Sequence, residues 1–223
     1  MIGIIFALES EAKSLLLQAN DLTPIKFLDK KAYSCKIEKQ DCIIVISGIG
    51  KVSASICAQK LIDEYMIDFI LNAGTCGGTD NSVKIKNFYA VEKCFQFDFD
   101  VTEIDDVEIG YIQEYDRVFF PVSTNGLSFL EKTSLATADR FSNEDKDLNL
   151  LKKNGCAIRD MEGAAIAQTC LSNNIPFFSI KGVTDVYGSG VAKEQFYGNL
   201  TSVCEELSII IKKALLNIIN AVK

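Results

Sequence analysis

Three groups of carboxylates are the side chains of this chain best suited to acid–base chemistry. Glu9 and Glu11 follow the apolar run IGIIFAL, Asp160 and Glu162 precede the apolar stretch GAAIAQTCL, and Asp185 closely follows the apolar run PFFSIKGV. The chain contains no histidine, so it lacks the usual neutral-pH base and cannot use a Ser–His or Cys–His mechanism. General acid–base catalysis would therefore need one ionised and one protonated carboxyl, whose environments push their pKa values apart.

A purely structural explanation exists for each group. Acids in the first turn of a helix offset the helix dipole by about 0.3–1 kcal/mol, which is sufficient to explain Glu11 and Glu162. Asp185 could cap a turn, although burial at the mouth of an apolar strand would raise its pKa and keep it protonated. We interpret Asp160 as a strand-end residue that supports its neighbour.

Two glycine-rich motifs accompany the acids. SGIGK (Ser47–Lys51) and NAGTCGG (Asn72–Gly78) each follow a strand-like run. Neither contains GxGxxG or GxxxxGK[ST], so neither indicates a dinucleotide site or a P-loop. Taken alone, each predicts a tight turn or a close backbone approach.

Alternating strand-like and helix-like segments must position these groups. Apolar runs predict strands at 2–8, 42–47, 68–74, 87–95, 133–138 and 176–183, and a hairpin within 24–38. Helices are expected at 10–20 with Ser10 as N-cap, at 51–65 with Val52, Ile56, Leu61 and Tyr65 on one face, at 161–171 and at 193–222. Residues 102–124 have no regular pattern and are expected to form a loop.

This alternation predicts an α/β fold. We expect a three-layer sandwich with a central mixed, mostly parallel sheet flanked by helices, forming a single domain over residues 1–223. In such folds, ligand sites lie beyond the carboxyl ends of the strands. The carboxylates and the glycine-rich motifs occur at such ends.

Composition argues against several classes of partner. The net charge is −7, and Arg117, Arg140 and Arg159 are scattered, so no basic stripe is available for nucleic acid or an anionic membrane. There is no basic leader and no apolar segment near the roughly 20 residues that cross a bilayer. The eight cysteines form no CxxC pair and are expected to be reduced core residues of a cytoplasmic protein.

The motifs, in their chain order, resemble the purine nucleoside phosphorylase and hydrolase superfamily. They are Glu11 after the first strand, SGIGK, NAGTCGG, TADRF, DMEG and the late pair Thr184–Asp185. The chain resembles the 5′-methylthioadenosine/S-adenosylhomocysteine nucleosidase branch over residues 2–99 and from 134 onward. The resemblance implies a homodimeric hydrolase without metal or cofactor that releases adenine from 5′-substituted adenine nucleosides. Its substrates would be methylthioadenosine, S-adenosylhomocysteine or 5′-deoxyadenosine.

The resemblance also implies roles for individual residues. Glu11 would activate the attacking water, Asp185 would protonate adenine, and Glu162 would hold the ribose 2′- and 3′-hydroxyls. The other candidate substrate-binding residues are Met161 on the sugar, Phe141 stacked on adenine, Ser142 at the base edge, Thr184 beside the acid, the hydroxyl residue Thr75, and the apolar residues Leu8 and Ile49.

Charge favours water over phosphate as the nucleophile. Phosphorolysis needs a cationic pocket, but residues 1–116 contain no arginine and Glu11 would repel phosphate. Lys51 or Lys181 would weaken this argument if either pointed into the site. A purine nucleoside phosphorylase, a futalosine-type hydrolase and a non-enzymatic nucleoside-binding module remain alternatives.

Two features depart from the family. Phe97 stands near the position where many relatives carry a histidine that is lent to the partner's pocket, and residues 102–121 lack the family's usual pattern. Without that histidine the 5′ pocket would be more apolar. We therefore hypothesise that a small alkylthio group is accepted better than a homocysteine tail.

Overall fold

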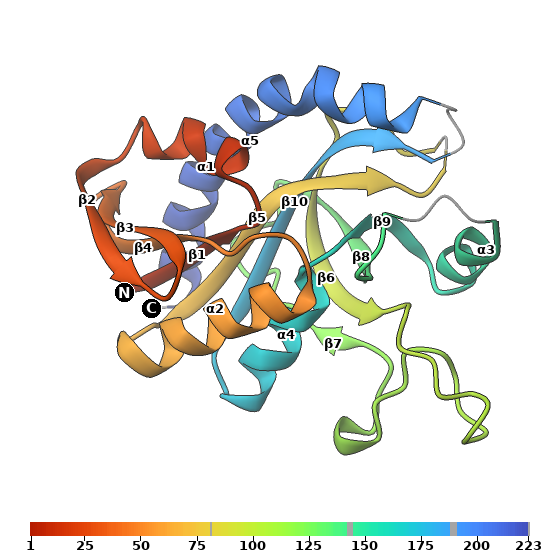
Figure 1. Ribbon diagram of the computed structural model, residues 1–223. Helices are drawn as coiled ribbons and strands as arrows, with labels where there is room; N and C mark the ends of the chain where they lie inside the picture. The colour runs from red at the N-terminus through yellow and green to blue at the C-terminus, as the bar shows by residue number, and fades with distance from the viewer. Residues whose placement is uncertain (81, 142–144, 188–190, 223) are drawn as a thin grey trace.

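The computed structural model describes residues 1–80, 82–141, 145–187 and 191–222 as a layered α/β molecule (Figure 1). The strands are β1 (Ile2–Phe6), β2 (Asn20–Phe27), β3 (Lys30–Ile37), β4 (Gln40–Ile46), β5 (Phe69–Gly78), β6 (Phe88–Gln96), β7 (Phe120–Pro121), β8 (Glu131–Thr137), β9 (Cys156–Asp160) and β10 (Phe177–Val186). The helices are α1 (Glu9–Leu16), α2 (Lys51–Glu64), α3 (Asp145–Lys153), α4 (Gly163–Ser172) and α5 (Ala192–Val222), with a short 3-10 helix, η1 (Gln113–Tyr115).

β5 is the centre of the sheet. It pairs in parallel with β1 and with β10, and its last residues, Gly77 and Gly78, pair with β9. From β10 the order runs through β6, β8 and β9 back to β5, so this part of the sheet closes into a barrel, while β1, β4, β3 and β2 extend from β5. The α/β class and the mixed sheet are confirmed. The closure could not be predicted from the alternation of elements, because it depends on β5 having three partner strands.

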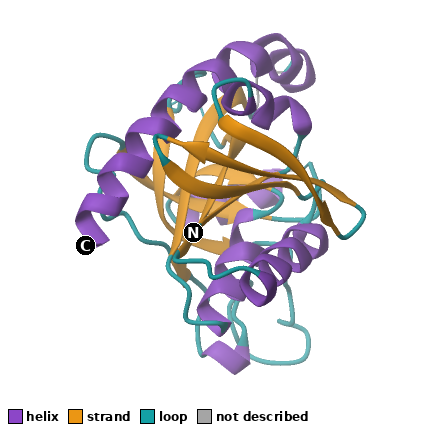
Figure 2. Cartoon of the chain, turned by 90° about the vertical axis from the view of Figure 1, so that its left-hand side faces the viewer, coloured by secondary structure: helices purple, strands orange, loops and turns teal. Residues whose placement is uncertain are grey.

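Helices cover both faces of the sheet. α1 packs against α5, and α2 packs against α4. The strands lie between these two pairs of helices in both views (Figure 1 and Figure 2). Each pair closes its own apolar core, one containing Leu15 and Leu207 and the other containing Leu61 and Ile166.

NAGTCGG is part of a strand and not a turn. The motif forms the second half of β5, which is buried along most of its length. SGIGK does form the predicted turn, since Gly48 and Gly50 have φ angles of 82° and 101°, which glycine adopts without strain. The glycines of NAGTCGG therefore need another explanation, which the neighbouring side chains provide.

The start of α1 differs from the expected one. Leu8 is the N-cap, and Ser10 lies inside the helix. The Leu8 N–H donates to Glu11 Oε2 at 3.0 Å, so the glutamate satisfies a backbone donor at the helix start. The expected cap at Ser10 is wrong, because the helix already begins at Glu9 with Leu8 as its N-cap.

The buried face of α2 also differs from the expected one. Val52 and Ile56 are 69% and 49% exposed. The helix is buried instead through Ala54, Cys57, Ala58 and Leu61. Small side chains let α2 approach the sheet and α4 closely, which leaves the branched side chains outside.

Other expectations agree with the structure. The C-terminal helix forms as predicted and is buried through Val203, Leu207, Ile211 and Leu215. The cysteines are all buried and free, and residues 102–124 consist mainly of turns and bends with η1 and β7. The sequence patterns do not predict α3 or β9. No helix in the described ranges is long and apolar enough to cross a membrane.

Candidate active site

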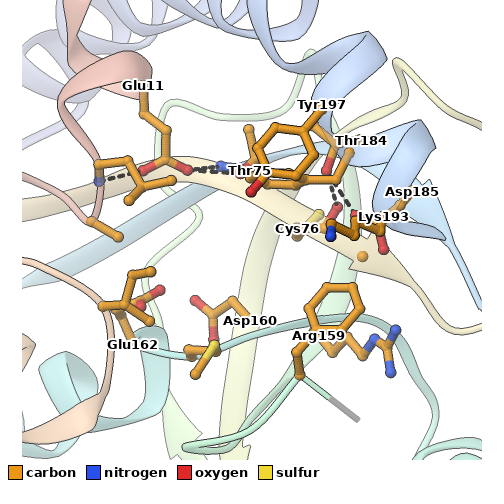
Figure 3. A pocket seen from close by; sticks show the side chains of 17 residues that line it. Glu11, Thr75, Cys76, Arg159, Asp160, Glu162, Thr184, Asp185, Lys193 and Tyr197 are labelled. Atoms are coloured by element: carbon orange, nitrogen blue, oxygen red, sulfur yellow. Dashed lines mark hydrogen bonds between the residues drawn. The ribbon is translucent and has the colours of Figure 1, made fainter. Parts of the chain in front are cut away.

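A cavity of about 410 Å³ opens at the carboxyl ends of β1, β5, β9 and β10 (Figure 3). Nine of the residues singled out from the sequence line it: Leu8, Glu11, Ile49, Thr75, Phe141, Met161, Glu162, Thr184 and Asp185. Ser142 lies outside the described residues. Figure 3 shows Glu11 and Asp185 along one side of the cavity and Asp160 and Glu162 along the other.

Glu11 is held rigidly although it stands in the first turn of a helix. Its side chain is 4% exposed. The backbone N–H and the hydroxyl of Thr75 both donate to Oε1 at 2.7 Å, and the Leu8 N–H donates to Oε2. A Cβ on Gly74 would lie 2.9 Å from Oε1. Glycine at position 74 therefore makes room for this carboxylate.

Glu9, in contrast, has the ordinary role of a surface acid. Its side chain is 56% exposed and pairs with Lys31 at 2.6 Å. The structural explanation suffices for Glu9. It does not account for the burial of Glu11.

Asp185 is as buried as Glu11, but fewer hydrogen-bond donors surround its carboxyl group. It is 1% exposed, and Oδ1 accepts a hydrogen bond from the Thr184 hydroxyl at 2.9 Å. Among the described residues, Oδ2 has no hydrogen-bond partner. Burial raises the pKa of Asp185, and the Thr184 hydrogen bond and the charge of Arg159 oppose this rise only in part. Asp185 therefore keeps its proton to a higher pH than an ordinary aspartate.

Glu162 is the N-cap of α4 and reaches across to the SGIGK turn. It is 6% exposed, and its Oε1 accepts the Gly50 N–H at 3.0 Å. Burial, reinforced by the charge of Asp160, raises the pKa of Glu162 to about 8, while Lys181 and the Gly50 N–H act against the rise. Glu162 therefore binds its proton more tightly than an ordinary glutamate.

Asp160 supports the site through an ion pair. Its Oδ2 lies 2.8 Å from Lys181 Nζ, and both side chains are 2% exposed. The Thr137 hydroxyl and the Gly163 N–H also donate to this carboxylate. Burial lowers the pKa of Lys181, but Asp160 and Glu162 more than compensate and raise it. Asp160 thus does more than the sequence interpretation assigned to it, because it also lines the cavity.

Sequence reasoning missed five further lining residues with polar or aromatic side chains or a thiol: Cys76, Arg159, Lys193, Phe196 and Tyr197. Lys193, Phe196 and Tyr197 are spaced as one helix face, so the start of the predicted C-terminal helix carried a usable signal. Arg159 directly precedes DMEG, but β9 is not predicted from the sequence, so nothing indicated where its side chain points.

The two lysines that could have favoured phosphate are both occupied. Lys51 Nζ pairs with Asp98 Oδ1 at 2.6 Å, and Lys181 pairs with Asp160. Neither lysine is among the residues that line the cavity. Within the described part of the chain, no three His, Cys, Asp or Glu side chains are grouped so that they could hold a metal ion.

Phe97 does not have the place that the sequence argument gave it. Its side chain is 3% exposed and packs with Phe95, Ala138 and Leu151 in a small core of its own chain. It therefore offers almost no surface to a 5′ pocket. The chain still has no histidine at this position, so the preference for small alkylthio groups stays a prediction.

Comparison with known proteins agrees with the geometry. The family model described as the phosphorylase superfamily matches residues 1–217. A 5′-methylthioadenosine/S-adenosylhomocysteine nucleosidase of Buchnera aphidicola is 32% identical over an alignment that covers 98% of this chain and 99% of that protein. The chain belongs to this nucleosidase family.

Solved structures have the same fold as this chain. The nucleosidase of Colwellia psychrerythraea, crystallised in complex with adenine, is 27% identical with a TM-score of 0.88, over 97% of this chain and 95% of that one. A futalosine hydrolase of Helicobacter pylori is 21% identical with a TM-score of 0.89, over 96% of each chain. At that identity, the second likeness concerns the fold alone.

Proposed function

We propose that this protein hydrolyses the N-glycosidic bond of 5′-substituted adenine nucleosides and releases adenine, with residues 1–223 acting as one domain. The observation that carries the proposal is the convergence of three buried carboxyls, Glu11, Glu162 and Asp185, on one cavity. The names of the related nucleosidases support this activity, as does the adenine in the Colwellia structure.

Asp185 serves as the general acid. Adenine leaves poorly as an anion, so a proton on its imidazole ring is needed as the bond to the sugar breaks. Asp185 is buried, keeps its proton to a raised pH and has an oxygen without a partner in the described structure. The electron pair of the C1′–N9 bond passes to adenine, and the Asp185 proton moves to a ring nitrogen.

Glu11 serves as the general base for water. Its oxygens already accept three hydrogen bonds, but a carboxylate has about four lone-pair sites, so one remains for the attacking water. Water adds to C1′ from the face opposite adenine, and Glu11 takes its proton. This is the geometry of an inverting glycosidase applied to an N-glycosidic bond.

Glu162 and Met161 bind the ribose between these two groups. A carboxyl at the start of α4 can hydrogen-bond to both the 2′- and the 3′-hydroxyl, and these bonds strengthen as positive charge develops on the sugar. Asp160 and Lys181 form an ion pair whose two charges act on the pKa of Glu162 in opposite directions. Phe141 and the backbone of Ser142 contact adenine, Thr184 orients Asp185, and Leu8, Ile49 and Thr75 complete the substrate-binding wall.

The charge distribution supports hydrolysis over phosphorolysis. The nucleophile side of the cavity is formed by Glu11, an anion, and the buried cation Lys181 is paired with Asp160. Arg159 lies beside Asp185, on the side of the leaving base. A phosphate nucleophile would therefore meet a carboxylate where it needs a cation.

We also propose that the protein is a cytoplasmic homodimer, as the family resemblance implies. Exposed apolar side chains that a second subunit could cover support the dimer. Ile49 at the cavity is 55% exposed, and Val52 and Ile56 on the neighbouring helix α2 are exposed as well. Eight buried free cysteines suit a reducing compartment. Light scattering on the purified protein tests the dimer, and a monomer at micromolar concentration would contradict it.

The activity is tested by incubating purified protein with methylthioadenosine in phosphate-free buffer while free adenine is followed. We expect adenine release without phosphate, and a loss of at least about 10²-fold in kcat for Asp185→Asn. Asp100→Asn is the matched control, because Asp100 is exposed and, within the described ranges, its side chain accepts hydrogen bonds from Thr102 alone. S-adenosylhomocysteine, 5′-deoxyadenosine and futalosine complete the substrate panel.

Three outcomes would contradict the proposal. Adenine release that requires added phosphate would identify a phosphorylase. Binding of methylthioadenosine without cleavage would identify a nucleoside-binding module. Near wild-type turnover of Asp185→Asn would remove the assigned acid.

A further inference from the structure

Gly77 separates two ionisable side chains, Arg159 and Asp185, which lie on the strands at either side of it. In the sheet register Gly77 of β5 pairs with Arg159 of β9 on one side and with Asp185 of β10 on the other. Residues paired in this way project to the same face of a sheet. Because glycine has no side chain, Arg159 and Asp185 face each other across an empty position.

The width of this gap follows from the glycine. A Cβ on Gly77 would lie 3.0 Å from Asp185 Oδ2 and 3.1 Å from Arg159 Nε. The two atoms are therefore at most about 6 Å apart, the sum of these distances. At such a separation a cation stabilises the charged form of a carboxylate.

Arg159 is fixed in this place by its surroundings. It is 7% exposed, and its guanidinium carbon lies 5.4 Å from the Phe141 ring centroid and 5.6 Å from that of Tyr187. Burial lowers the pKa of Arg159, and Asp185 is the largest of the groups that raise it. The guanidinium therefore remains charged beside the aspartate.

The other ionisable groups around Asp185 differ from Arg159 in charge or in burial. Lys193 and Tyr197 reach the cavity from α5 and are exposed. The remaining groups are the Cys76 thiol on β5, Tyr187 directly after β10 and, elsewhere in the cavity wall, the acids Glu11, Asp160 and Glu162. Among the described residues, Arg159 is the buried cation facing Asp185 across Gly77.

We propose that Arg159 is a positioning residue that acts through the general acid Asp185. Its charge stabilises the Asp185 carboxylate that forms when the proton passes to the purine. This inference rests on the proposed function. In the step itself, the O–H bond of Asp185 breaks, an N–H bond forms on the purine ring, and the electron pair of the O–H bond stays on Oδ2. The Arg159 charge then opposes the cost of leaving a carboxylate in a buried position.

The charge should make Asp185 a stronger acid without taking its proton away at neutral pH. A charge at about 6 Å shifts a pKa by roughly 0.5 unit at the dielectric constant of water and by roughly 2 units at an effective value of 20. Replacing Arg159 by a neutral residue should therefore raise the pKa of Asp185 further and weaken it as a proton donor. Arg159→Met should move the alkaline limb of kcat/KM upward by about 0.5–2 pH units and lower kcat more than it raises KM.

A site-specific titration tests this without any turnover. The Asp185 carboxyl is followed by carbon-13 NMR of labelled aspartate in the ligand-free protein, with the signal assigned from Asp185→Asn. Its titration should move upward by about 0.5–2 pH units in Arg159→Met and return most of the way in Arg159→Lys. This signal also separates Asp185 from Glu162, whose own pKa of about 8 falls in the same range of kcat/KM profiles.

Arg140→Met is the matched control. Arg140 pairs with Asp147 at 2.7 Å and lies over Phe97, so its replacement should leave the Asp185 titration unchanged. Arg159→Gln serves as the second variant if the methionine variant does not fold.

A leaving group that needs no proton provides the kinetic test. Arg159→Met should slow release of adenine more than release of 4-nitrophenolate from a riboside with the same 5′ group. An equal loss on both substrates with an unmoved Asp185 titration would overturn the proposal. Failure of the wild-type protein to release adenine would overturn the proposed function instead, and the titration would still report on the Arg159–Asp185 pair.

Discussion

Replacement of Glu11 by glutamine is the most direct test of the base, because the structure predicts its effect on two separate properties. Glu11 accepts hydrogen bonds from the Thr75 N–H and hydroxyl at one oxygen and from the Leu8 N–H at the other. A glutamine amide has one acceptor oxygen and one donor group. Whichever way the amide is turned, its NH₂ faces a backbone N–H of Leu8 or of Thr75.

The size of both effects follows from this geometry. An unsatisfied buried N–H costs about 1–3 kcal/mol, and for a protein of this size each kcal/mol changes the Tm by about 2–4 °C. Glu11→Gln should therefore lower the Tm by about 2–12 °C. Because the amide cannot take a proton from water, kcat should fall by about 10²–10⁴-fold.

The assay pairs thermal unfolding with adenine release, and Glu9→Gln is its control. Glu9 stands in the same turn of α1 but is exposed and paired with Lys31, so its replacement should leave Tm and turnover close to those of the wild type. Loss of activity with an unchanged Tm would refute the predicted hydrogen bonding. An active Glu11→Gln enzyme would refute the role of Glu11 as base.

Two further predictions concern the buried charges. Asp160→Asn leaves Lys181 buried without the Asp160 carboxylate and should lower the free energy of unfolding, measured in urea, by about 3–5 kcal/mol. The double variant Asp160→Asn/Lys181→Met should recover part of that loss. Equal stability of the single and double variants would contradict the pairing. Glu162 binds its proton more tightly in the folded state, with a pKa of about 8 against about 4.3 unfolded, so the free energy of unfolding should decrease as pH rises from about 4.5 to 8. Glu162→Gln should remove that decrease, of up to about 1.4 kcal/mol per pH unit, and raise KM; parallel stability curves for the two proteins would show that Glu162 does not titrate in this range.

The sequence predicted the residues of the site better than their surroundings. Glu11 and Asp185 follow the strands β1 and β10, which apolar runs mark clearly, and the parallel strands β1, β5 and β10 bring such ends together. Burial could not be predicted, because Glu9 and Glu11 both stand in the first turn of α1 but only Glu11 contacts Thr75. Nothing within ten residues of Glu11 indicates that contact.

Arg159 shows a second limit of sequence reasoning. β9 spans only Cys156–Asp160 and pairs with β5 through its last residues. β1 is equally short but consists of apolar residues and glycine, IGIIF, whereas β9 has the sequence CAIRD and ends in two charged residues, so no apolar run marks it. The place of Arg159 depends on this pairing across 82 positions of the chain, so its role could only emerge from the folded structure.

The glycine-rich motif NAGTCGG in β5 makes room for two carboxyl groups of the candidate site, those of Glu11 and Asp185. A side chain at Gly74 would collide with Glu11, and a side chain at Gly77 would lie between Asp185 and Arg159. Because β5 pairs with β1, β9 and β10, the strand cannot shift to relieve either collision. The buried strand thus holds both glycines in place, and they leave the space in which the Glu11 and Asp185 carboxyls fit.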